Sequence, residues 1–362
     1  MLKDKKLLED LISCQSITPS EAGCINIISS YLGCEPRLIN RNQTTNAYYE
    51  FGHKGPLFLF TGHIDVVEPG PLNRWINNPF TLTENENKLY ARGIVDMKGA
   101  VYAFCSAFKN IEKSIQARVG ILLTSDEEGS GIDGLAFAIP KLKINANWAL
   151  VGEPTSVHTF GDTFKHERRG SYHFHITIQG KQGHIAYPTL AKNPSDELIH
   201  FLETVKAIKA SLEPGNVLSI YSIETSTHTV NMIPESLTIK LNLRYQNSHV
   251  IAEILNSFKA IDPNVQGHLG AQPYSSNPTL LKSALKAAIK DTIGINAKSS
   301  HLGGTSDARF LQPIAKEIIE FGLLSCTAHQ INEMTPVNDL QNLQIIYQKL
   351  LLTLLENPGN QT

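Results

Sequence analysis

The sequence predicts an α/β protein in which a mixed, mostly parallel sheet is covered by helices and carries a smaller inserted α+β domain. Over roughly the first 168 residues, apolar runs typical of buried strands alternate with helical patterns, and strands separated by helices imply a largely parallel sheet. Near residue 170 the strands begin to alternate in side-chain character, as half-exposed strands do. A chain of 362 residues is also long for one core, which favours two domains.

The first part of the chain predicts most elements of the larger domain. Apolar residues recur at helical spacing near the start, and Thr18-Pro19-Ser20 before Glu21 predicts the cap of a second helix that runs through Tyr31. Strands follow at 46–51, 56–61, 119–124 and 146–151, with a helix at 97–111. From residue 279 the same pattern returns, with helices at 280–289 and 338–355 and a strand at 316–321.

The middle of the chain predicts the inserted domain. Strands at 171–178, 216–225, 236–245 and 265–269 are separated by helices at 194–212 and 249–260. This order is β-α-β-β-α-β, the split-βαβ or ferredoxin-like arrangement. We therefore expect a discontinuous catalytic domain, 1–169 and 284–362, around an inserted domain at 170–283.

Composition and charge exclude several classes of protein. Lys and Arg number 32 and Asp and Glu 34, a net charge of -2, without the basic excess of a nucleic-acid or membrane-surface protein. The charged N-terminus lacks the apolar core of a signal peptide, and no apolar run approaches a membrane span. Five scattered cysteines without a CxxC suggest no disulfide framework. We expect a cytoplasmic protein.

Residues of types that commonly bind metals follow the predicted strands. His63 and Asp65 come after one strand, Glu127 and Glu128 after the next, Glu153 after a third and His329 downstream of a fourth, while Asp96 precedes a helix. Sites in open α/β sheets form outside the carboxyl ends of strands. Two imidazoles and several carboxylates gathered there predict a pocket for two divalent metals, and a spare carboxylate suits hydrolysis.

Each of these residues also has an ordinary explanation when taken alone. Asp96 could cap the following helix, Glu127-Glu128 could be an exposed acidic turn, and His329 could be a surface histidine. If His63 is a metal ligand, the chain would have to turn back for the Asp65 carboxylate to reach and support it. One of the two adjacent glutamates could ligate while the other takes a proton from water.

The motifs together resemble the M20-type co-catalytic zinc peptidases and deacylases, in order and over nearly the whole chain. Arg168-Arg169-Gly170-Ser171 and the segment from Gly303 to Phe310 resemble the desuccinylase branch of that family more than its acetylornithine deacetylases. The other shared blocks are Thr61-Gly62-His63-Ile64-Asp65, Tyr90-Ala91-Arg92-Gly93, Asp96-Met97-Lys98-Gly99, Thr124-Ser125-Asp126-Glu127-Glu128-Gly129, Gly152-Glu153-Pro154-Thr155, Gln182-Gly183-His184 through Pro188, and His329-Gln330-Ile331-Asn332-Glu333.

The resemblance implies a zinc-exopeptidase-like catalytic domain, two Zn²⁺ per subunit, with Co²⁺ possible at one site, and amide hydrolysis. It implies that the inserted domain mediates a homodimer and brings His184 into the partner's site. The implied roles are His63 and Glu153 on one zinc, Glu128 and His329 on the other, Asp96 bridging, Glu127 as base and Asp65 supporting His63.

The resemblance also implies an anionic N-acyl amino acid substrate, whose carboxylates require fixed cations in the site. Arginine suits this role, because a guanidinium donates two parallel hydrogen bonds to a carboxylate. Arg168 and Arg244 are the predicted groups; if the chain there is extended, only one of Arg168 and Arg169 faces the pocket. Neutral contacts are predicted from Tyr187, Asn231, Gly304, Thr305 and Ser306. The alternatives are another amidohydrolase of the same family, a non-catalytic binding protein on a hydrolase scaffold, and an interaction module with solvated acidic turns.

Overall fold

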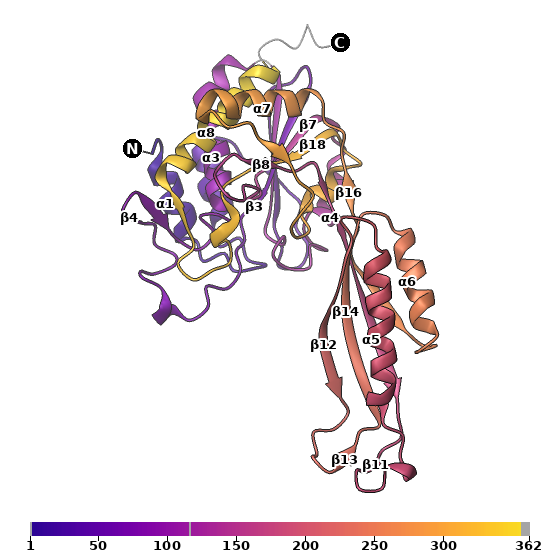
Figure 1. The fold of residues 1–362 in the computed structure, drawn as a ribbon. Helices are drawn as coiled ribbons and strands as arrows, with labels where there is room; N and C mark the ends of the chain where they lie inside the picture. Colours follow the sequence, from indigo (N-terminus) through magenta and orange to yellow (C-terminus); the bar gives the residue numbers. More distant parts are fainter. Residues whose placement is uncertain (1, 116, 356–362) are drawn as a thin grey trace. The chain divides into compact units, whose positions relative to one another are not determined.

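The structure, a computed structural model, describes residues 2–115 and 117–355, and the chain divides into two compact units (Figure 1). The first unit comprises the residues up to Glu167, Ser275–His301 and those from Ser306 onward. The second comprises Arg168–Tyr274 and Leu302–Thr305. These bounds differ from the expected 170–283, chiefly because the stretch after Tyr274 packs with the first unit. Residues 356–362 of the expected catalytic domain lie outside the described residues.

The first unit is built on a six-stranded sheet of order β1-β2-β6-β3-β7-β18. The strands β6, β3, β7 and β18 run parallel, and β1 and β2 are antiparallel at one edge. Their bounds are β1 Arg37–Leu38, β2 Asn46–Phe51, β3 Leu57–His63, β6 Arg118–Thr124, β7 Ala146–Val151 and β18 Ala315–Glu320. The expected mostly parallel sheet is confirmed, and its main strands lie within two residues of their predicted bounds.

Both faces of this sheet are buried, as a parallel sheet requires. Phe58 and Phe60 of β3 join the main core, whereas Leu57 and Leu59 are buried on the other face. The Phe60 and Phe104 rings stack with centroids 4.1 Å apart. The helices of this unit are α1 Lys5–Ser13, α2 Cys24–Leu32, α3 Lys98–Ile111, α4 Leu135–Leu142, α7 Leu280–Ile293 and α8 Val337–Leu355.

The start of helix α2 corrects the sequence prediction. Helix α2 has Gly23 as its N-cap, at φ 91°, without a side-chain cap. Instead of Thr18-Pro19-Ser20, the Glu21 carboxylate supports the first turn and accepts a hydrogen bond from the Ile25 N–H at 3.0 Å. A three-stranded sheet of order β19-β5-β4 and a pair of strands, β17 and β8, complete the unit. Their bounds are β4 Thr83–Asn85, β5 Lys88–Tyr90, β8 Thr163–Phe164, β17 Lys298–Ser299 and β19 Met334–Pro336.

The second unit is built on an antiparallel sheet of order β12-β14-β10-β15. Buried side chains of the helices α5 and α6 pack against this sheet and form the core of the unit with it. The expected β-α-β-β-α-β order is confirmed. Its elements are β10 Gly170–Gln179, β11 Gly183–His184, α5 Pro194–Ser211, β12 Val217–Thr225, β13 Met232–Ile233, β14 Ser236–Tyr245, α6 His249–Lys259 and β15 Gln266–Ala271. The strands β9 Glu167–Arg168 and β16 Tyr274–Ser275 lie where the chain passes between units. Within the described ranges, every helix is too short or too polar to cross a membrane.

Candidate metal centre

Parallel strands of the first unit carry the predicted metal-binding residues to one edge of the sheet. His63 ends β3 and pairs in register with Thr124, which ends β6. Glu127 and Glu128 follow β6, and Glu153 follows β7, which pairs in parallel with β3 on its other side. The carboxyl ends of three neighbouring strands therefore bring these groups together, at the edge where α/β proteins place their sites.

Asp96 lies between the two histidines. Its Oδ1 is 3.0 Å from Nε2 of His63, and its Oδ2 is 3.3 Å from Nε2 of His329. The alternative of a helix cap does not fit, because α3 has Met97 at its N-cap position and no side-chain cap. One carboxylate thus presents its two oxygens to two different imidazoles, which is the geometry of a bridging ligand.

Two clusters of possible metal ligands share Asp96. His63, Asp96 and Glu153 form one, and Asp96, Glu128 and His329 form the other; within each, one ligand atom per residue lies within 4.8 Å of the others. Nε2 of His63 is 3.9 Å from Oε1 of Glu153. Nε2 of His329 is 2.8 Å from Oε1 of Glu128. Segments more than 200 residues apart in the chain therefore meet within one site.

Asp65 holds His63 chiefly through its backbone. Nδ1 of His63 is 2.9 Å from the Asp65 carbonyl oxygen, whereas the nearest carboxylate oxygen, Oδ1, is 3.7 Å away. Because a carbonyl only accepts, Nδ1 carries the proton and Nε2 is left to ligate. The other carboxylate oxygen accepts from the Thr18 hydroxyl at 2.7 Å and from the Glu128 N–H at 3.3 Å. The carboxylate therefore also fixes the loop that carries the adjacent glutamates.

Glu127 faces the same site as its neighbour. Its carboxylate belongs to a further cluster with His63 and Glu128. Burial and the nearby Glu153 carboxylate raise the pKa of Glu127 well above its ordinary value. A carboxyl whose pKa is raised holds a proton more readily, which suits it to exchanging protons.

The carboxylates of the site favour the protonated, positively charged forms of its two histidines. Burial would lower the pKa of His63, but the carboxylates of Asp96 and Asp65 outweigh it and raise that pKa well above its usual range. Asp96 and Glu128 raise the pKa of His329 to about 10. Hydrogen bonds from both histidines lower the pKa of Asp96, against the effect of burial.

The residues present fit a pair of divalent cations. Imidazole nitrogens and carboxylate oxygens are donors that zinc accepts. Each of the two clusters offers one imidazole and one carboxylate of its own, together with an oxygen of the shared Asp96. Without cations, the carboxylates gathered in this buried site repel one another, which is costly.

Sequence reasoning missed the role of Glu333. This carboxylate is fully buried and accepts hydrogen bonds from the N–H groups of Gly93, Val95 and Asp96 at 3.0, 2.8 and 3.2 Å. It also forms an ion pair with Arg92 at 2.6 Å. Glu333 therefore fixes the loop that presents Asp96. Its place four residues after His329, in one motif, was the available signal.

In the second unit, Arg168 contacts the loop predicted to bind substrate. Its Nη1 donates to the Gly304 carbonyl at 3.1 Å. Arg169 instead donates to the Gly215 carbonyl at 2.9 Å, and both guanidinium side chains are buried. Burial and the charge of Arg244 lower the pKa of Arg169. Arg244 lies on β14, directly opposite Ser171 of β10.

Three other predicted residues gather around the small β11–β13 pair of the second unit. His184 pairs with Met232 in register, and the His184 and Tyr187 rings lie 5.6 Å apart. The Asn231 carbonyl accepts from the Ile185 N–H at 3.1 Å. His184, Tyr187 and Asn231 are all exposed.

The remaining predicted contacts lie in the loop before the turn at residues 307–311. Thr305 is half-buried in the second unit. Ser306 is buried in the first unit, and its hydroxyl accepts from the Ala308 N–H at 3.1 Å. The Ser306 side chain is therefore engaged in capping this turn.

Known proteins are similar to this chain in sequence or in fold. Residues 59–353 match peptidase family M20/M25/M40. A curated relative from Nitrosococcus oceani, named succinyl-diaminopimelate desuccinylase, is 36% identical over 97% of this chain and 98% of its own length. This likeness extends through both units and therefore includes the inserted domain.

Solved structures have the same fold at low sequence identity. A tripeptidase from Staphylococcus aureus superposes with a TM-score of 0.77 at 15% identity, covering all of both chains. A protein from Bacillus subtilis, described as a dinuclear metal-binding peptidase of family M20, gives a TM-score of 0.66 at 14% identity, covering 98% of this chain and 99% of that one. With the family match over most of its length, the chain belongs to peptidase family M20/M25/M40.

Proposed function

We propose that this chain hydrolyses the amide of N-succinyl-LL-2,6-diaminopimelate to succinate and LL-2,6-diaminopimelate, a step of lysine and diaminopimelate biosynthesis. The observation that carries the proposal is the 36% identity to a relative of that name, which extends over 97% of the chain. The clustered histidines and carboxylates supply a site suited to metal-assisted hydrolysis.

The proposed cofactor is a pair of zinc ions. His63 and Glu153 would hold one ion, Glu128 and His329 the other, and Asp96 both, in keeping with the two clusters that share Asp96. Bound zinc lowers the pKa of water to about 7 and polarises an amide carbonyl. Cobalt at one position would use the same donors.

The proton chemistry falls to Glu127. Its raised pKa and its place beside the ligands support a role as general base, which accepts the proton of the attacking water. The same carboxyl then returns that proton to the leaving amine as the C–N bond breaks. When water attacks the amide carbonyl, its oxygen becomes an oxyanion. A hydrogen bond donated by an imidazole N–H of the partner subunit's His184 would stabilise that oxyanion.

Recognition of the substrate carboxylates is assigned to Arg168 and Arg244. The contact of Arg168 with Gly304 supports its place beside the Gly304–Thr305 loop. Arg169 is engaged with Gly215 and is left out of the proposed site. Tyr187 and Asn231, which lie near His184, would contact substrate together with it from a partner subunit in a homodimer.

The setting proposed is the cytoplasm, because the described cysteines are free thiols, as a reducing compartment keeps them. The proposed activity is tested by turnover assays on N-succinyl-LL-2,6-diaminopimelate and on N-acetylornithine, with and without chelator. We expect chelator-sensitive release of succinate, and at least a hundredfold lower kcat/KM on acetylornithine. Equal or higher turnover of acetylornithine would assign the chain to another amidohydrolase of the family, and activity unaffected by complete metal removal would exclude the metal centre.

A further inference from the structure

Three histidines lie together on the helix-free face of the second unit, separate from the metal cluster described above. Phe174 and Ile176 of β10 are buried in the core with the helices, so His173 and His175, which alternate with them, point to the opposite face. His268 of β15 is the register partner of His173, and directly opposed residues share one face of a sheet.

The three rings are in contact. The centroids of the His173 and His268 rings are 4.7 Å apart and their planes differ by 3°. The His175 ring meets His268 edge-on at 5.5 Å. Burial, followed by the neighbouring His268 and the charge of Arg244, lowers the pKa of His173. Its imidazole is therefore neutral at neutral pH, which is the form that binds metals.

We propose that His173, His175 and His268 form a second, independent site for an imidazole-preferring divalent ion such as Cu²⁺ or Zn²⁺. Two histidines at alternate positions of one strand and a third on the adjacent strand place three imidazole rings next to one another on one face of the sheet. Imidazole suits copper and zinc, and copper binds such donors most tightly among the divalent first-row ions.

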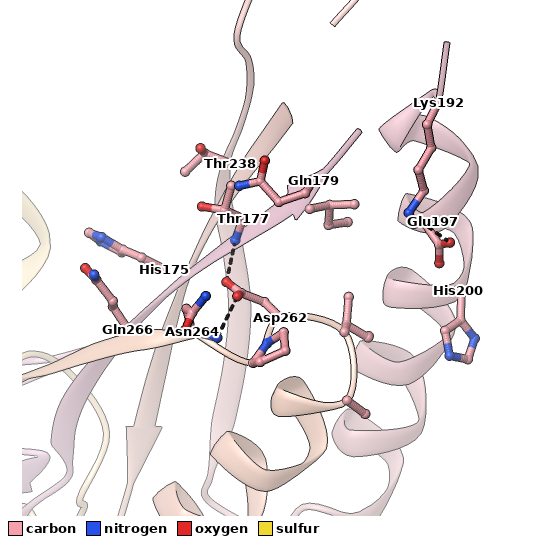
Figure 2. Close-up of a pocket in the computed structure, with 14 residues that line it drawn as sticks. His175, Thr177, Gln179, Lys192, Glu197, His200, Thr238, Asp262, Asn264 and Gln266 are labelled. Atoms are coloured by element: carbon pink, nitrogen blue, oxygen red, sulfur yellow. Dashed lines mark hydrogen bonds and ion pairs between the residues drawn. The ribbon is translucent and has the colours of Figure 1, made fainter. Parts of the chain in front are cut away.

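The three side chains are accessible from solvent, because His268 is exposed and His173 and His175 are half-buried. A pocket of about 600 Å³ is lined by His175 and by residues of α5 such as His200, and Figure 2 shows His175 next to Gln266, its register partner on β15. Among described residues, the groups whose ligand atoms already lie within 4.8 Å of one another are those of the first unit. Binding therefore requires the three rings to rotate from their stacked arrangement, and His268 is exposed and has room to do so.

The environment of His173 shows how the rings would be held. The Asn242 side-chain amide, from the neighbouring strand β14, lies 3.3 Å from Nε2 of His173 and donates to the Ser171 hydroxyl at 2.8 Å. Because the amide nitrogen can only donate, Nε2 accepts and the proton of the neutral ring is on Nδ1, so His173 binds an ion through Nε2 once the Asn242 side chain turns away. His268 and His175 are the mobile partners.

The site is tested by adding Cu²⁺ to full-length protein that holds two equivalents of zinc per chain and has been freed of excess metal. We expect one Cu²⁺ per chain beyond the zinc, with nitrogen hyperfine structure in its electron paramagnetic resonance spectrum. The double variant His175→Gln/His268→Gln should bind that Cu²⁺ at least tenfold more weakly. His200→Gln, which replaces an exposed histidine of α5 that also lines the pocket, should bind it as the unaltered protein does.

Binding of equal strength by the double variant would overturn the proposal, and so would the lack of any Cu²⁺ beyond the zinc in the unaltered protein. Zinc content and succinate release, measured on the same samples, should be equal in all three proteins. A failure of this proposal therefore leaves the proposed hydrolase function unaffected, and a failure of that function leaves copper binding to be observed.

Discussion

The carboxylate of Glu333 accepts a hydrogen bond from the backbone N–H of Asp96 at 3.2 Å, so a buried glutamate positions the carboxylate that faces both histidines. The Glu333→Gln variant should bind zinc about 10- to 100-fold more weakly, as is usual when a group that orients metal ligands is lost. Zinc titration of the metal-depleted protein measures this.

The matched control for that variant is Glu317→Gln. Glu317 also accepts backbone hydrogen bonds, from Thr279 and Leu281 at 3.0 and 2.8 Å, but at the start of α7. It should lower the unfolding midpoint without changing zinc affinity. Equal zinc affinity of Glu333→Gln and the unaltered protein would show that the loop holds Asp96 without Glu333.

Substitution of the two adjacent glutamates should have different effects, on turnover for Glu127 and on metal binding for Glu128. Glu127→Gln is expected to keep both metal ions and to lose at least about 10²-fold in kcat, the usual effect of removing an acid–base group. Glu128→Gln should instead lose metal, because Glu128 contacts His329 at 2.8 Å. Metal content and kcat, measured on both variants, check this; near-normal turnover by Glu127→Gln would rule out the assigned base.

His184 provides a test of the proposed partner-subunit site. His184→Ala should fold and form dimers but turn over poorly. Mixing it with Glu127→Gln subunits should restore some activity, because in a heterodimer one site has both an intact base and an intact partner histidine. An absence of recovery, with heterodimers verified by mass, would place His184 in its own subunit's site or outside catalysis.

The charge balance of the site predicts how pH affects the protein once chelator has removed its metals. The pKa of His329, about 10, lies above that of an unperturbed histidine, so its proton stabilises the folded state fully below about pH 6.5, and this contribution is lost as pH rises toward 10. The urea midpoint should therefore fall between pH 6.5 and 10, and less so in His329→Gln.

A matched control for this pH experiment is His228→Gln, which alters an exposed histidine of the second unit. It should show the same fall in the urea midpoint as the unaltered protein. If His329→Gln kept the full fall as well, the ion pairs of His329 would not be its source.

Much of the sheet, and the meeting of the candidate metal-binding residues at one edge of it, could be predicted because each depends on local sequence. The apolar run before His63 predicts a buried strand, and the next polar residues must then lie at its carboxyl end. Alternation of side chains predicted β14 with its observed bounds, since Leu241 and its alternate neighbours are buried. These signals need no knowledge of distant contacts.

What could not be predicted depends on loops that meet only in the folded chain. The contact of the Asp65 carbonyl with His63, rather than its carboxylate, follows from the path of the chain after β3. The hydrogen bonds of Glu333 join segments about 240 residues apart. The cap of α2 was mispredicted because the helix begins only after Gly23. At this position the backbone has a positive φ, which threonine or serine rarely adopts.

The most direct test of the account is anomalous diffraction from crystals grown with zinc. It should reveal two zinc peaks per chain at the carboxyl edge of the six-stranded sheet, with one carboxylate oxygen of Asp96 on each, His63 and Glu153 on the first and Glu128 and His329 on the second. A single peak, or two peaks that do not share Asp96, would contradict it.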